Sequence, residues 1–325
     1  MRALEDISFV APAGEITCLL GASGCGKSTL LGLAAGLLRV QQGEVAVAGE
    51  VLADPRRNPP PEARPVGLVF QDGALFPHMT LRANVAFGMP KAQAGEADAW
   101  LARVGLAGMG GRYPHELSGG QQQRAALARA MAPEPAVLLM DEPFASVDIV
   151  LRRSLRRECR ILLREAGTTV VLVTHDPAEA LDVADRIAVM EAGRIVQFGT
   201  PPELHDSPAT AAVGAIFSGA QVVPGVVAEG GLDTPFGLWP LASIAGEMPD
   251  AARLDLLVQA DRLVPVADLR GGRVRDVHPL GPRSRVLLEG ADGAAITVET
   301  VLPVDPAKTY SVLPDPESVR AFARA

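Results

Sequence analysis

Lysine, cysteine and long apolar runs are scarce in this chain of 325 residues, and each scarcity excludes a class of protein. The longest apolar runs, such as Val137–Met140 and Thr169–Val173, have the length of a β-strand, whereas a helix that crosses a bilayer needs roughly 18 apolar residues. The N-terminal residues contain no signal-peptide core. We therefore expect a cytoplasmic protein that acts at a membrane only through a partner.

The three cysteines, Cys18, Cys25 and Cys159, are odd in number and lack the spacing of metal ligands, which is typical of a reducing compartment. The formal net charge of −8 argues against a nucleic-acid partner and against a polybasic lipid-binding patch. Almost all basic residues are arginines, so a lysine that ends a glycine-rich segment, Lys27, is notable.

Strand-like and helix-like segments alternate over residues 4–205, which predicts an α/β layer fold. The later strand runs are aliphatic or β-branched throughout, as buried parallel strands require. Residues 72–133 interrupt this alternation and are predicted to be a helical insertion. The predicted strands are Leu4–Val10, Ile16–Leu20, Val45–Val47, Val66–Gln71, Val137–Met140 and Val170–Thr174. The predicted helices are Lys27–Leu38, Ala92–Val104, Gly119–Met131 and Leu151–Glu165.

The composition changes after residue 202, where a short predicted helix, Ala209–Phe217, leads into a region rich in glycine and proline. Asp292-Gly293, between two short alternating segments, is a hairpin signal. We predict one α/β domain over residues 1–219 and a small β-domain of OB-like, open-barrel topology over residues 220–325, with a plain sandwich as the alternative. The strands predicted there are Leu254–Val258, Val274–Val277, Arg285–Leu288, Ile296–Val301 and Ser311–Leu313.

The segment Gly21-Ala22-Ser23-Gly24-Cys25-Gly26-Lys27-Ser28 matches the pattern G-x-x-x-x-G-K-[ST] in full, between a predicted strand and a predicted helix. Its glycines let backbone N–H groups surround phosphate oxygens, and the helix N-terminus adds a favourable field. Lys27 is expected to reach the β- and γ-phosphates, and Ser28 to supply a hydroxyl to Mg²⁺. The match predicts a nucleotide site.

An acidic pair follows the strand Val137–Met140. Asp141 is expected to face the phosphate site and to hold the Mg²⁺ shell, and Glu142 to polarise an attacking water. General-base assistance of this kind typically contributes about 10²–10⁴-fold in rate. The alternative interpretation of such a pair is a solvated turn.

Two further polar residues follow predicted strands. Gln71 ends one strand and could touch both the metal and the water, although a lone Gln is usually an ordinary loop residue. His175 ends the strand Val170–Thr174, so its imidazole should emerge at the carboxyl edge of the sheet, where open α/β sheets bind ligands. An isolated His is more often structural, but this position favours a functional role.

The segment Leu117-Ser118-Gly119-Gly120-Gln121 precedes a second helix with a glycine-rich N-terminus, which could receive phosphate through N–H donors and a hydroxyl. The alternative is an ordinary Ser N-cap. Since the chain already has a complete phosphate loop, a second anion site would be surplus unless it served another subunit's nucleotide. The segment therefore predicts a dimer.

Taken in this order, the motifs of residues 4–205 resemble those of an ATP-binding cassette (ABC) ATPase. The matching motifs are Walker A (Gly21–Ser28), the Q-loop (Gln71), the signature (Leu117–Gln121), Walker B (Val137–Asp141), the catalytic Glu142, the D-loop (Ala145–Asp148) and the switch His175. The resemblance implies a P-loop NTPase core with a helical subdomain and a head-to-tail homodimer. Each signature would lie over the ATP held by the other subunit's Walker A.

The resemblance also implies ATP and Mg²⁺ as ligands and assigns roles to particular residues. The implied catalytic residues are Glu142, His175, Gln71 and Lys27. The implied nucleotide-binding residues are Gly21, Ala22, Ser23, Gly24, Cys25, Gly26, Lys27, Ser28, Thr29, Ser118, Gly119, Gly120, Gln121 and Asp148. The implied metal-binding residues are Ser28, Gln71 and Asp141.

Asp72–Met89 looks like the segment of such ATPases that meets the coupling helix of a membrane permease. The C-terminal region resembles the regulatory TOBE domain of importer ATPases. The residues most similar to the iron(III) group are Pro77, Gln121–Arg124, Phe144 and Gly167-Thr168-Thr169. The implied function is the ATP-hydrolysing subunit of an ABC importer, with ferric iron as a candidate solute. It would bind peripherally at the cytoplasmic face of the membrane, linked to a solute-binding protein only indirectly.

Two departures from the family pattern concern the adenine site and the D-loop. No aromatic residue precedes Phe9, although the family usually stacks one on adenine, so we expect either a longer N-terminus or looser adenine binding. The D-loop reads Ser146-Val147-Asp148, a mild change from the common Ala-Leu-Asp.

Two other functions compete with import. The first is a soluble ABC ATPase with a mechanical role in repair or translation; such proteins usually carry two cassettes or a long coiled coil, and this chain has one cassette and no heptads. The second is a non-enzymatic regulator that senses a ligand through its β-domain, which the intact Asp141-Glu142 pair disfavours.

Overall fold

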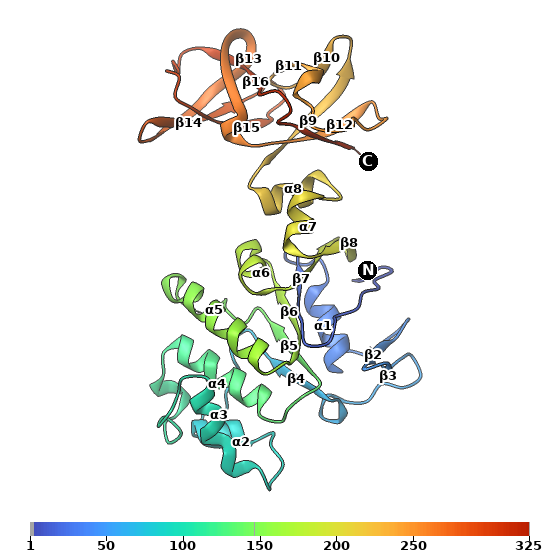
Figure 1. The fold of residues 1–325 in the computed structure, drawn as a ribbon, viewed down its shortest axis with the longest axis vertical. Helices are drawn as coiled ribbons and strands as arrows, with labels where there is room; N and C mark the ends of the chain where they lie inside the picture. The colour runs from blue at the N-terminus through green and yellow to red at the C-terminus, as the bar shows by residue number, and fades with distance from the viewer. Residues whose placement is uncertain (1–2, 146, 325) are drawn as a thin grey trace. The chain divides into compact units, whose positions relative to one another are not determined.

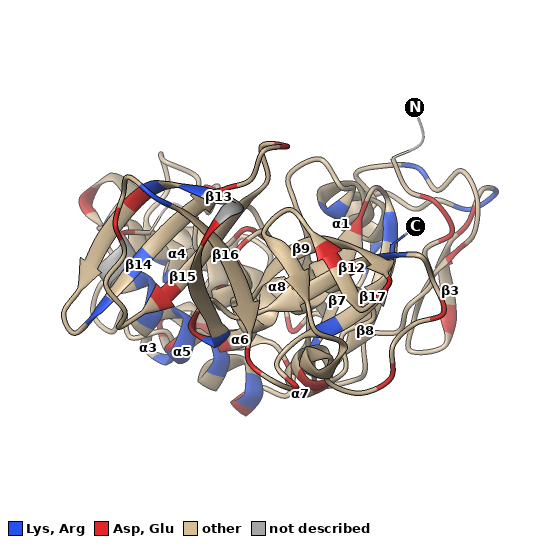
Figure 2. Ribbon diagram, turned by 90° about the horizontal axis from the view of Figure 1, so that it is seen from above, with Lys and Arg blue, Asp and Glu red and all other residues tan. Residues whose placement is uncertain are grey.

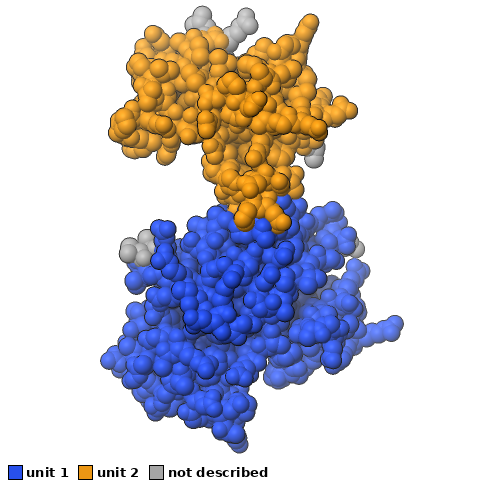
Figure 3. All heavy atoms as spheres, viewed as in Figure 1, with its two compact units in different colours: residues 1–201 blue, residues 202–325 orange. Residues whose placement is uncertain are grey.

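Aliphatic strands at the centre of a six-stranded sheet organise the N-terminal part of the computed structural model. The structure describes residues 3–145 and 147–324. They divide into two units, Met1–Pro201 and Pro202–Ala325, each coloured separately in Figure 3. No helix among the described residues is both long enough and apolar enough to cross a bilayer.

The sheet of unit 1 has the order β4-β5-β6-β1-β7-β8. The first five strands are parallel, and β8 pairs with β7 in the antiparallel sense. Because β1, β5 and β6 lie inside the sheet with both faces covered, their residues are nearly all buried. The bounds are β1 Ile16–Leu20, β4 Val66–Val69, β5 Val137–Asp141, β6 Thr169–Thr174, β7 Arg186–Glu191 and β8 Arg194–Gly199. A separate two-stranded sheet pairs β2 Val45–Val47 with β3 Glu50–Ala53.

Helices cover the sheet on both sides, and Figure 1 shows α1 and α5 on opposite sides of the strands. Helix α1, Lys27–Ala35, packs on β5 and β6 through Leu31 and Ala35. It ends at Gly36, whose φ of 83° gives the left-handed C-cap that glycine favours. Helix α6, Pro177–Val183, lies against β1 and β6, and α5, Ile149–Glu165, packs on α6. The result is the α/β layer arrangement expected from the sequence.

The helical insertion contains α2 Leu81–Ala86, α3 Ala97–Arg103 and α4 Gly119–Met131, which contact one another. The prediction of α4 is confirmed at both ends, since the helix begins at Gly119 and ends at Met131. Ser118 caps its N-terminus. Helix α3 is shorter than the predicted Ala92–Val104, since Pro90 and Gly95 leave a turn and a short 3₁₀ segment, Ala94–Glu96, ahead of it.

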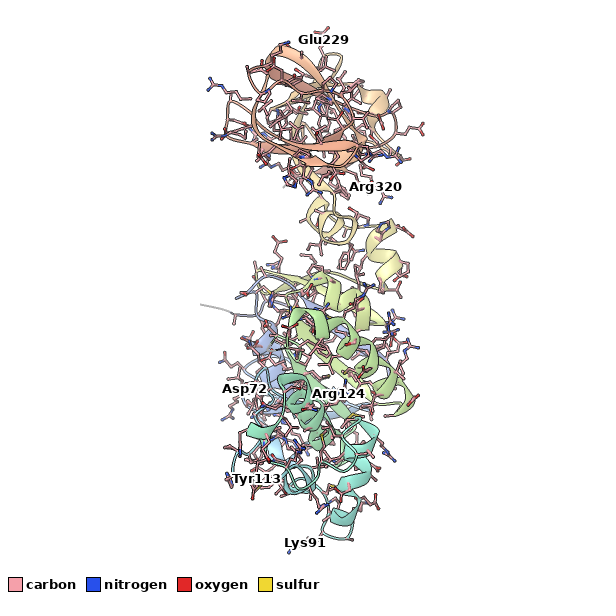
Figure 4. All side chains as sticks on the ribbon, turned by 90° about the vertical axis from the view of Figure 1, so that its left-hand side faces the viewer. Asp72, Lys91, Tyr113, Arg124, Glu229 and Arg320 are labelled. Carbon is pink, nitrogen blue, oxygen red and sulfur yellow. The ribbon has the colours of Figure 1, made fainter. Side chains whose placement is uncertain are left out.

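Unit 2 begins with two short helices and continues as two antiparallel sheets around one apolar core. Trp239 and Phe236 are fully buried in that core. Arg320, labelled in Figure 4, donates from Nη1 to the Asp206 carbonyl at 2.9 Å and so ties the last strand to the first helix of the unit. The sheet orders are β11-β10-β9-β12-β17 and β15-β14-β13-β16. The bounds are α7 Pro201–Asp206, α8 Ala211–Ser218, β9 Gln221–Ala228, β10 Gly231–Thr234, β11 Gly237–Trp239, β12 Arg253–Val258, β13 Leu263–Leu280, β14 Arg283–Glu289, β15 Ala295–Thr300, β16 Thr309–Pro314 and β17 Arg320–Ala323.

Three expectations about local structure require comment. The strand predicted over Leu4–Val10 is wrong: the segment has no ladder, only a bond from the Glu5 N–H to the Gly193 carbonyl, while Ile7 and Phe9 pack against the core of unit 1. The hairpin at Asp292-Gly293 is confirmed, since it joins β14 and β15 with Gly293 at a φ of 83°. The predicted strands of the β-domain correspond to β12–β16, and only the predicted Ile296–Val301 extends past its strand, by one residue, since β15 ends at Thr300.

Candidate functional site

The register of the sheet brings the predicted site residues to one edge. Leu20 is paired with Thr174, Asp141 with Val173, and Val69 with Met140. Because these strands are parallel, the residues that follow them emerge at the same carboxyl edge. Gly21, Glu142 and His175 each follow one of these strands directly, and Gln71 follows β4 after one further residue.

The phosphate loop curls between β1 and α1 around its own lysine. Lys27 is buried, and its Nζ donates to the carbonyls of Gly21 at 2.7 Å and Ala22 at 2.9 Å. Gly26, the N-cap of α1, has a φ of 106° and provides no side-chain cap. The loop therefore combines a bare helix N-terminus with a buried cation, which is an environment that favours phosphate.

Two glycines of the loop are required by close packing. A Cβ on Gly21 would lie 2.3 Å from the Met190 carbonyl oxygen, and one on Gly26 would lie 2.7 Å from that of Ala3. The Cys25 thiol is buried beside the loop and 3.7 Å from the Lys27 Nζ. This agrees with a packing role for Cys25.

Asp141 ends β5 and contacts the phosphate loop, since the Ser28 hydroxyl donates to its Oδ1 at 3.3 Å. Burial raises the pKa of the Asp141 carboxyl, the bond from Ser28 opposes this, and the charge of Glu142 adds to it. A hydroxyl and a carboxylate in contact are the hard oxygen ligands that Mg²⁺ prefers. The donor set thus fits a magnesium ion held by Ser28 and Asp141.

Glu142 and His175 form a pair across the strand ends. The Nδ1 of His175 lies 3.0 Å from Oε1 of Glu142, with 54% of the His side chain and 22% of the Glu side chain exposed. Glu142 adopts a φ of 43°, a strained value for a residue with a side chain, and its N–H donates to the Val173 carbonyl at 3.0 Å. Strain of this kind is found where the position of a side chain matters.

Gln71 lies at the same edge, in an exposed turn after β4, and it has interactions with neighbouring groups. The segment that follows is braced from two sides. Asn84, fully buried, accepts from the Phe76 N–H at 2.8 Å and donates to the Phe76 carbonyl at 3.1 Å. Arg129 of α4 donates to the carbonyls of Ala74 at 2.7 Å and Gly73 at 3.1 Å.

Two aromatic rings pair with each other in this segment, which follows Gln71. Phe76 and Phe87 lie 4.6 Å apart between ring centroids, and Phe87 is exposed. Figure 4 labels Asp72, at the start of the segment, and Tyr113 and Lys91 in the same part of unit 1. An exposed aromatic ring that packs on a second, half-buried ring is suited to contact with another protein.

The signature segment lies apart from the phosphate loop of its own chain. Figures 1 and 2 both show α4 well away from α1. Ser118 is exposed, its Oγ accepts from the Gln121 N–H at 3.4 Å, and the Gln121 Oε1 accepts from the Ser118 N–H at 3.0 Å. The alternative reading as a Ser N-cap is therefore correct as geometry, and it leaves the phosphate reading open.

The D-loop falls partly outside the described residues, because Ser146 is not among them. Val147 is buried and Asp148 is exposed immediately before α5. Arg152, one turn into α5, donates from Nη2 to the carbonyls of Ala145 at 3.3 Å and Val147 at 3.0 Å. This arginine was not predicted as a functional residue, and it fixes the backbone carbonyls of Ala145 and Val147.

Comparison with known proteins gives a consistent answer. A family model described as ABC transporter matches residues 4–145. The sulfate/thiosulfate import ATP-binding protein CysA 2 of Chromobacterium violaceum is 42% identical over 310 residues, which cover 91% of this chain and 83% of that protein. The Fe(3+) ions import ATP-binding protein FbpC of Pseudomonas fluorescens is 43% identical over 271 residues, covering 82% of this chain and 75% of that one.

A solved structure agrees with these relatives. The dimeric post-hydrolysis state of the ATP-binding cassette MJ0796, bound to ADP and Pi, has a TM-score of 0.52 and 30% identity with this chain. The match covers 61% of this chain and 90% of the other.

Proposed function

This chain belongs to the ATP-binding proteins of ABC transporters, and on that premise we propose that it powers solute import by hydrolysing ATP at the strand-end edge of unit 1. The observation that carries the proposal is the convergence of four groups on that edge. Asp141 ends β5, and the phosphate loop, Glu142 and His175 follow the adjacent strands β1, β5 and β6. Ser28 contacts Asp141, and Glu142 contacts His175. The alternative of a soluble ATPase with a mechanical role finds no support, because relatives that match most of the chain are import proteins.

The phosphate loop binds the triphosphate of ATP in this proposal. The bare N-terminus of α1 supplies N–H donors, and Lys27 exchanges the Gly21 and Ala22 carbonyls for phosphate oxygens. Ser28 and Asp141, with Gln71 nearby, would hold Mg²⁺, which when bound neutralises charge on the phosphate oxygens.

Glu142 is the proposed base, and His175 is its partner. The Glu142 carboxylate is positioned to accept a proton from the attacking water, and its strained backbone keeps it at the sheet edge. His175 orients that carboxylate through Nδ1 and presents the rest of its ring toward the edge, where it can meet charge that develops on the γ-phosphoryl group.

The signature residues Ser118, Gly119, Gly120 and Gln121 are proposed to serve the ATP of a second copy of this chain in a head-to-tail dimer. The Ser118 Oγ uses a lone pair for the Gln121 N–H, and among the described residues its own hydrogen goes to no acceptor. Ser118 can thus donate to a phosphate while still capping α4. The exposed Asp148 belongs to the same proposed interface.

The proposed partner in the membrane is a permease, which would dock on the Phe76–Phe87 pair. We propose two candidate solutes, Fe(3+) and sulfate or thiosulfate, because some relatives are named for import of the first and others for import of the second. Uptake of ⁵⁵Fe(III) and of ³⁵S-labelled sulfate and thiosulfate, measured with and without this gene, distinguishes the two. We propose that the chain sits on the cytoplasmic face of the membrane through this permease.

The mechanism is tested with Glu142→Gln. We expect ATP to bind with nearly unchanged affinity and hydrolysis to fall by about 10²–10⁴-fold, the range typical of a lost general base. Glu134→Gln is the matched control, because Glu134 is also a glutamate with positive φ, at 54°, and is exposed in a loop. Equal turnover of Glu142→Gln and the wild type would remove Glu142 from the mechanism.

A further inference from the structure

A cluster of charged side chains lies next to His175 along the chain, with Arg156 and Glu179 buried and Asp176 and Asp182 partly exposed. Arg156 of α5 is only 5% exposed, and its Nη2 is bonded to Oδ2 of Asp176. The same guanidinium lies 3.5 Å from Oε2 of Glu179 and 3.5 Å from Oδ2 of Asp182. One arginine therefore meets three carboxylates, all of them on α6 or its N-cap, within seven residues of His175.

Thr174 connects this cluster to the switch residue. Its hydroxyl donates to Oε2 of Glu179 at 2.9 Å and accepts from the Asp176 N–H at 3.0 Å. The two chain neighbours of His175, Thr174 and Asp176, are thus both held by side chains of the cluster. His175 itself points to the sheet edge and makes its contact with Glu142.

The cluster is difficult to explain as a device for stability alone. Oε1 of Glu179 and Nε of Arg156 are buried and have no hydrogen-bond partner among the described residues. Burial of such groups costs free energy, and a buried ion pair is often no more stable than an apolar replacement of similar volume. What the cluster does achieve is a fixed direction for the backbone on either side of His175.

Helix α5 links this cluster to the other half of the proposed catalytic pair. Arg152, one turn before Arg156, fixes the backbone at Ala145 and Val147, in the segment that follows Glu142. The two arginines on one rigid helix therefore hold the segments behind both members of the Glu142–His175 pair. Figure 2 shows basic residues gathered around α5.

We propose that Arg156 and Glu179 are positioning residues for ATP hydrolysis, which act through Thr174 and Asp176 to keep the His175 imidazole against Glu142. The inference rests on the proposed function, since it takes His175 and Glu142 as the hydrolytic pair. Neither positioning residue touches the phosphate loop in the contacts given above, so their loss should affect turnover rather than ATP binding.

Arg156→Gln is the first test, and Arg160→Gln is its matched control. Arg160 lies one turn further along α5 and bonds to the Val183 carbonyl, at the last residue of α6, and to Asp185 beyond it. Arg156→Gln should lower kcat by about 10- to 100-fold, the effect of a misplaced catalytic group, with KM for ATP within about threefold of wild type. Arg160→Gln should leave both constants near wild type, and equal kcat values for the two variants would overturn the proposal.

Substitutions at Thr174 and Glu179 test the proposal even if Arg156→Gln does not fold. Thr174→Val removes the hydroxyl at nearly constant volume, while Thr174→Ser keeps it, so kcat should fall in the first and be largely retained in the second. Glu179→Gln keeps an acceptor for Thr174 but removes the charge that faces Arg156, and should also lower kcat. Similar kcat values for Thr174→Val and Thr174→Ser, measured on folded protein, would contradict the proposal.

The imidazole of His175 provides a readout that does not depend on catalysis. Its ring ¹⁵N resonances, assigned by comparison with His175→Ala, should shift in Arg156→Gln and stay in place in Arg160→Gln. His175→Ala distinguishes the proposed catalytic role of His175 from the proposed positioning role of Arg156. If it retained wild-type kcat, the proposed function of His175 would fail; if it were inactive while Arg156→Gln was normal in kcat and in ¹⁵N shifts, only the positioning role would fail.

Discussion

The N-termini of α1 and α4 begin with similar sequences, a glycine-rich turn and a hydroxyl residue, yet they are built differently. Helix α1 starts at Gly26, which offers no side-chain cap and has a φ of 106°. Helix α4 starts at Ser118, which forms a complete capping box with Gln121. The first terminus has no side chain that competes with a ligand for its N–H groups, whereas in the second the Ser118 and Gln121 N–H groups already bond within the chain.

This difference between the two helix N-termini agrees with the stage at which each would bind phosphate. The loop before α1 holds a buried lysine and can bind phosphate within one subunit. The terminus of α4 is exposed and, in the proposed dimer, meets phosphate only after a second subunit arrives. A helix end that stays exposed before assembly is stabilised by a cap, typically by about 1 kcal/mol.

The largest expected effect is a loss of dimerisation, caused by a substitution that removes the proposed phosphate contact at the N-terminus of α4 but keeps the helix cap. Ser118→Asp keeps an N-cap acceptor but replaces the hydroxyl donor with a negative charge that repels phosphate. In a Glu142→Gln background we expect ATP to drive dimer formation, and the added Ser118→Asp to abolish it. Sedimentation velocity with and without ATP measures the dimer, and a fluorescent ATP analogue measures binding to the monomer.

Ser154→Asp supplies the control for added charge, since Ser154 is an exposed serine on α5. It should dimerise like the Glu142→Gln parent. The assignment of Ser118 to the partner's nucleotide would be wrong if Ser118→Asp dimerised equally well, or if it lost ATP binding as a monomer.

A pair of glycine substitutions compares the two termini directly. A Cβ on Gly26 would lie 2.7 Å from the Ala3 carbonyl oxygen on a backbone with positive φ, whereas one on Gly120 would meet nothing within 4 Å. Gly26→Ala should therefore lower ATP affinity at least tenfold and destabilise the fold by about 1–2 kcal/mol. Gly120→Ala should leave both quantities of the monomer unchanged, as measured by ATP titration and urea unfolding.

A third helix shows why part of this could not be predicted from the sequence. Asp176-x-x-Glu179 at the start of α6 has the same spacing as Ser118-x-x-Gln121, the pattern of a capping box. In α6, however, Asp176 caps the helix through the Ala178 N–H, while Glu179 turns inward to Thr174. The spacing within α6 cannot predict whether Glu179 joins the cap or turns inward. Glu179 is attracted by Arg156, which lies in α5, far away along the sequence.

The same limit explains the other outcomes. Motifs at strand ends could be predicted, since parallel strands bring the residues that follow them to one edge whatever the loops do. Strands β7 and β8 were not predicted, although Arg186–Glu191 and Arg194–Gly199 flank an Ala192-Gly193 turn in which both residues have positive φ. Strands β9–β11 were obscured by Pro224 and several glycines, although Pro224 and Gly225 lie within β9 and pair with β12.

The pH dependence of stability sharpens the contrast between α4 and α6, whose caps differ in charge. Burial raises the pKa of Glu179 from 4.5 to about 7, against the opposing bond from Thr174 and the charge of Arg156. A raised carboxyl pKa contributes stability that is fully present below the unfolded value of 4.5 and is lost as pH rises through about 7. The ionisable groups around it are Cys18, Cys159, Arg152, Arg156 and Asp176.

Glu179→Gln should remove this dependence. Relative to wild type, the variant should gain stability as pH rises from 4.5 to about 7, by up to about 3 kcal/mol, in urea unfolding at a series of pH values. Asp176→Asn should behave in the opposite sense. Despite partial burial, the bond from Arg156 holds the pKa of Asp176 below 3.8, so its contribution is present above that value and is lost as pH falls. Parallel stability curves for Glu179→Gln and wild type would contradict the assigned shift.

The smallest effect separates the cap of α4 from its proposed contact with phosphate. Gln121→Glu retains an acceptor for the Ser118 N–H and adds a negative charge in the first turn, so monomer stability should stay equal or rise by about 0.3–1 kcal/mol. The same charge should weaken ATP-driven dimerisation in the Glu142→Gln background, because in the proposed dimer it would face the partner's nucleotide. Gln121→Ala should do the reverse, costing a few tenths to about 1 kcal/mol of stability and affecting the dimer less. If stability and dimerisation moved together in both variants, the signature would act only as a helix cap.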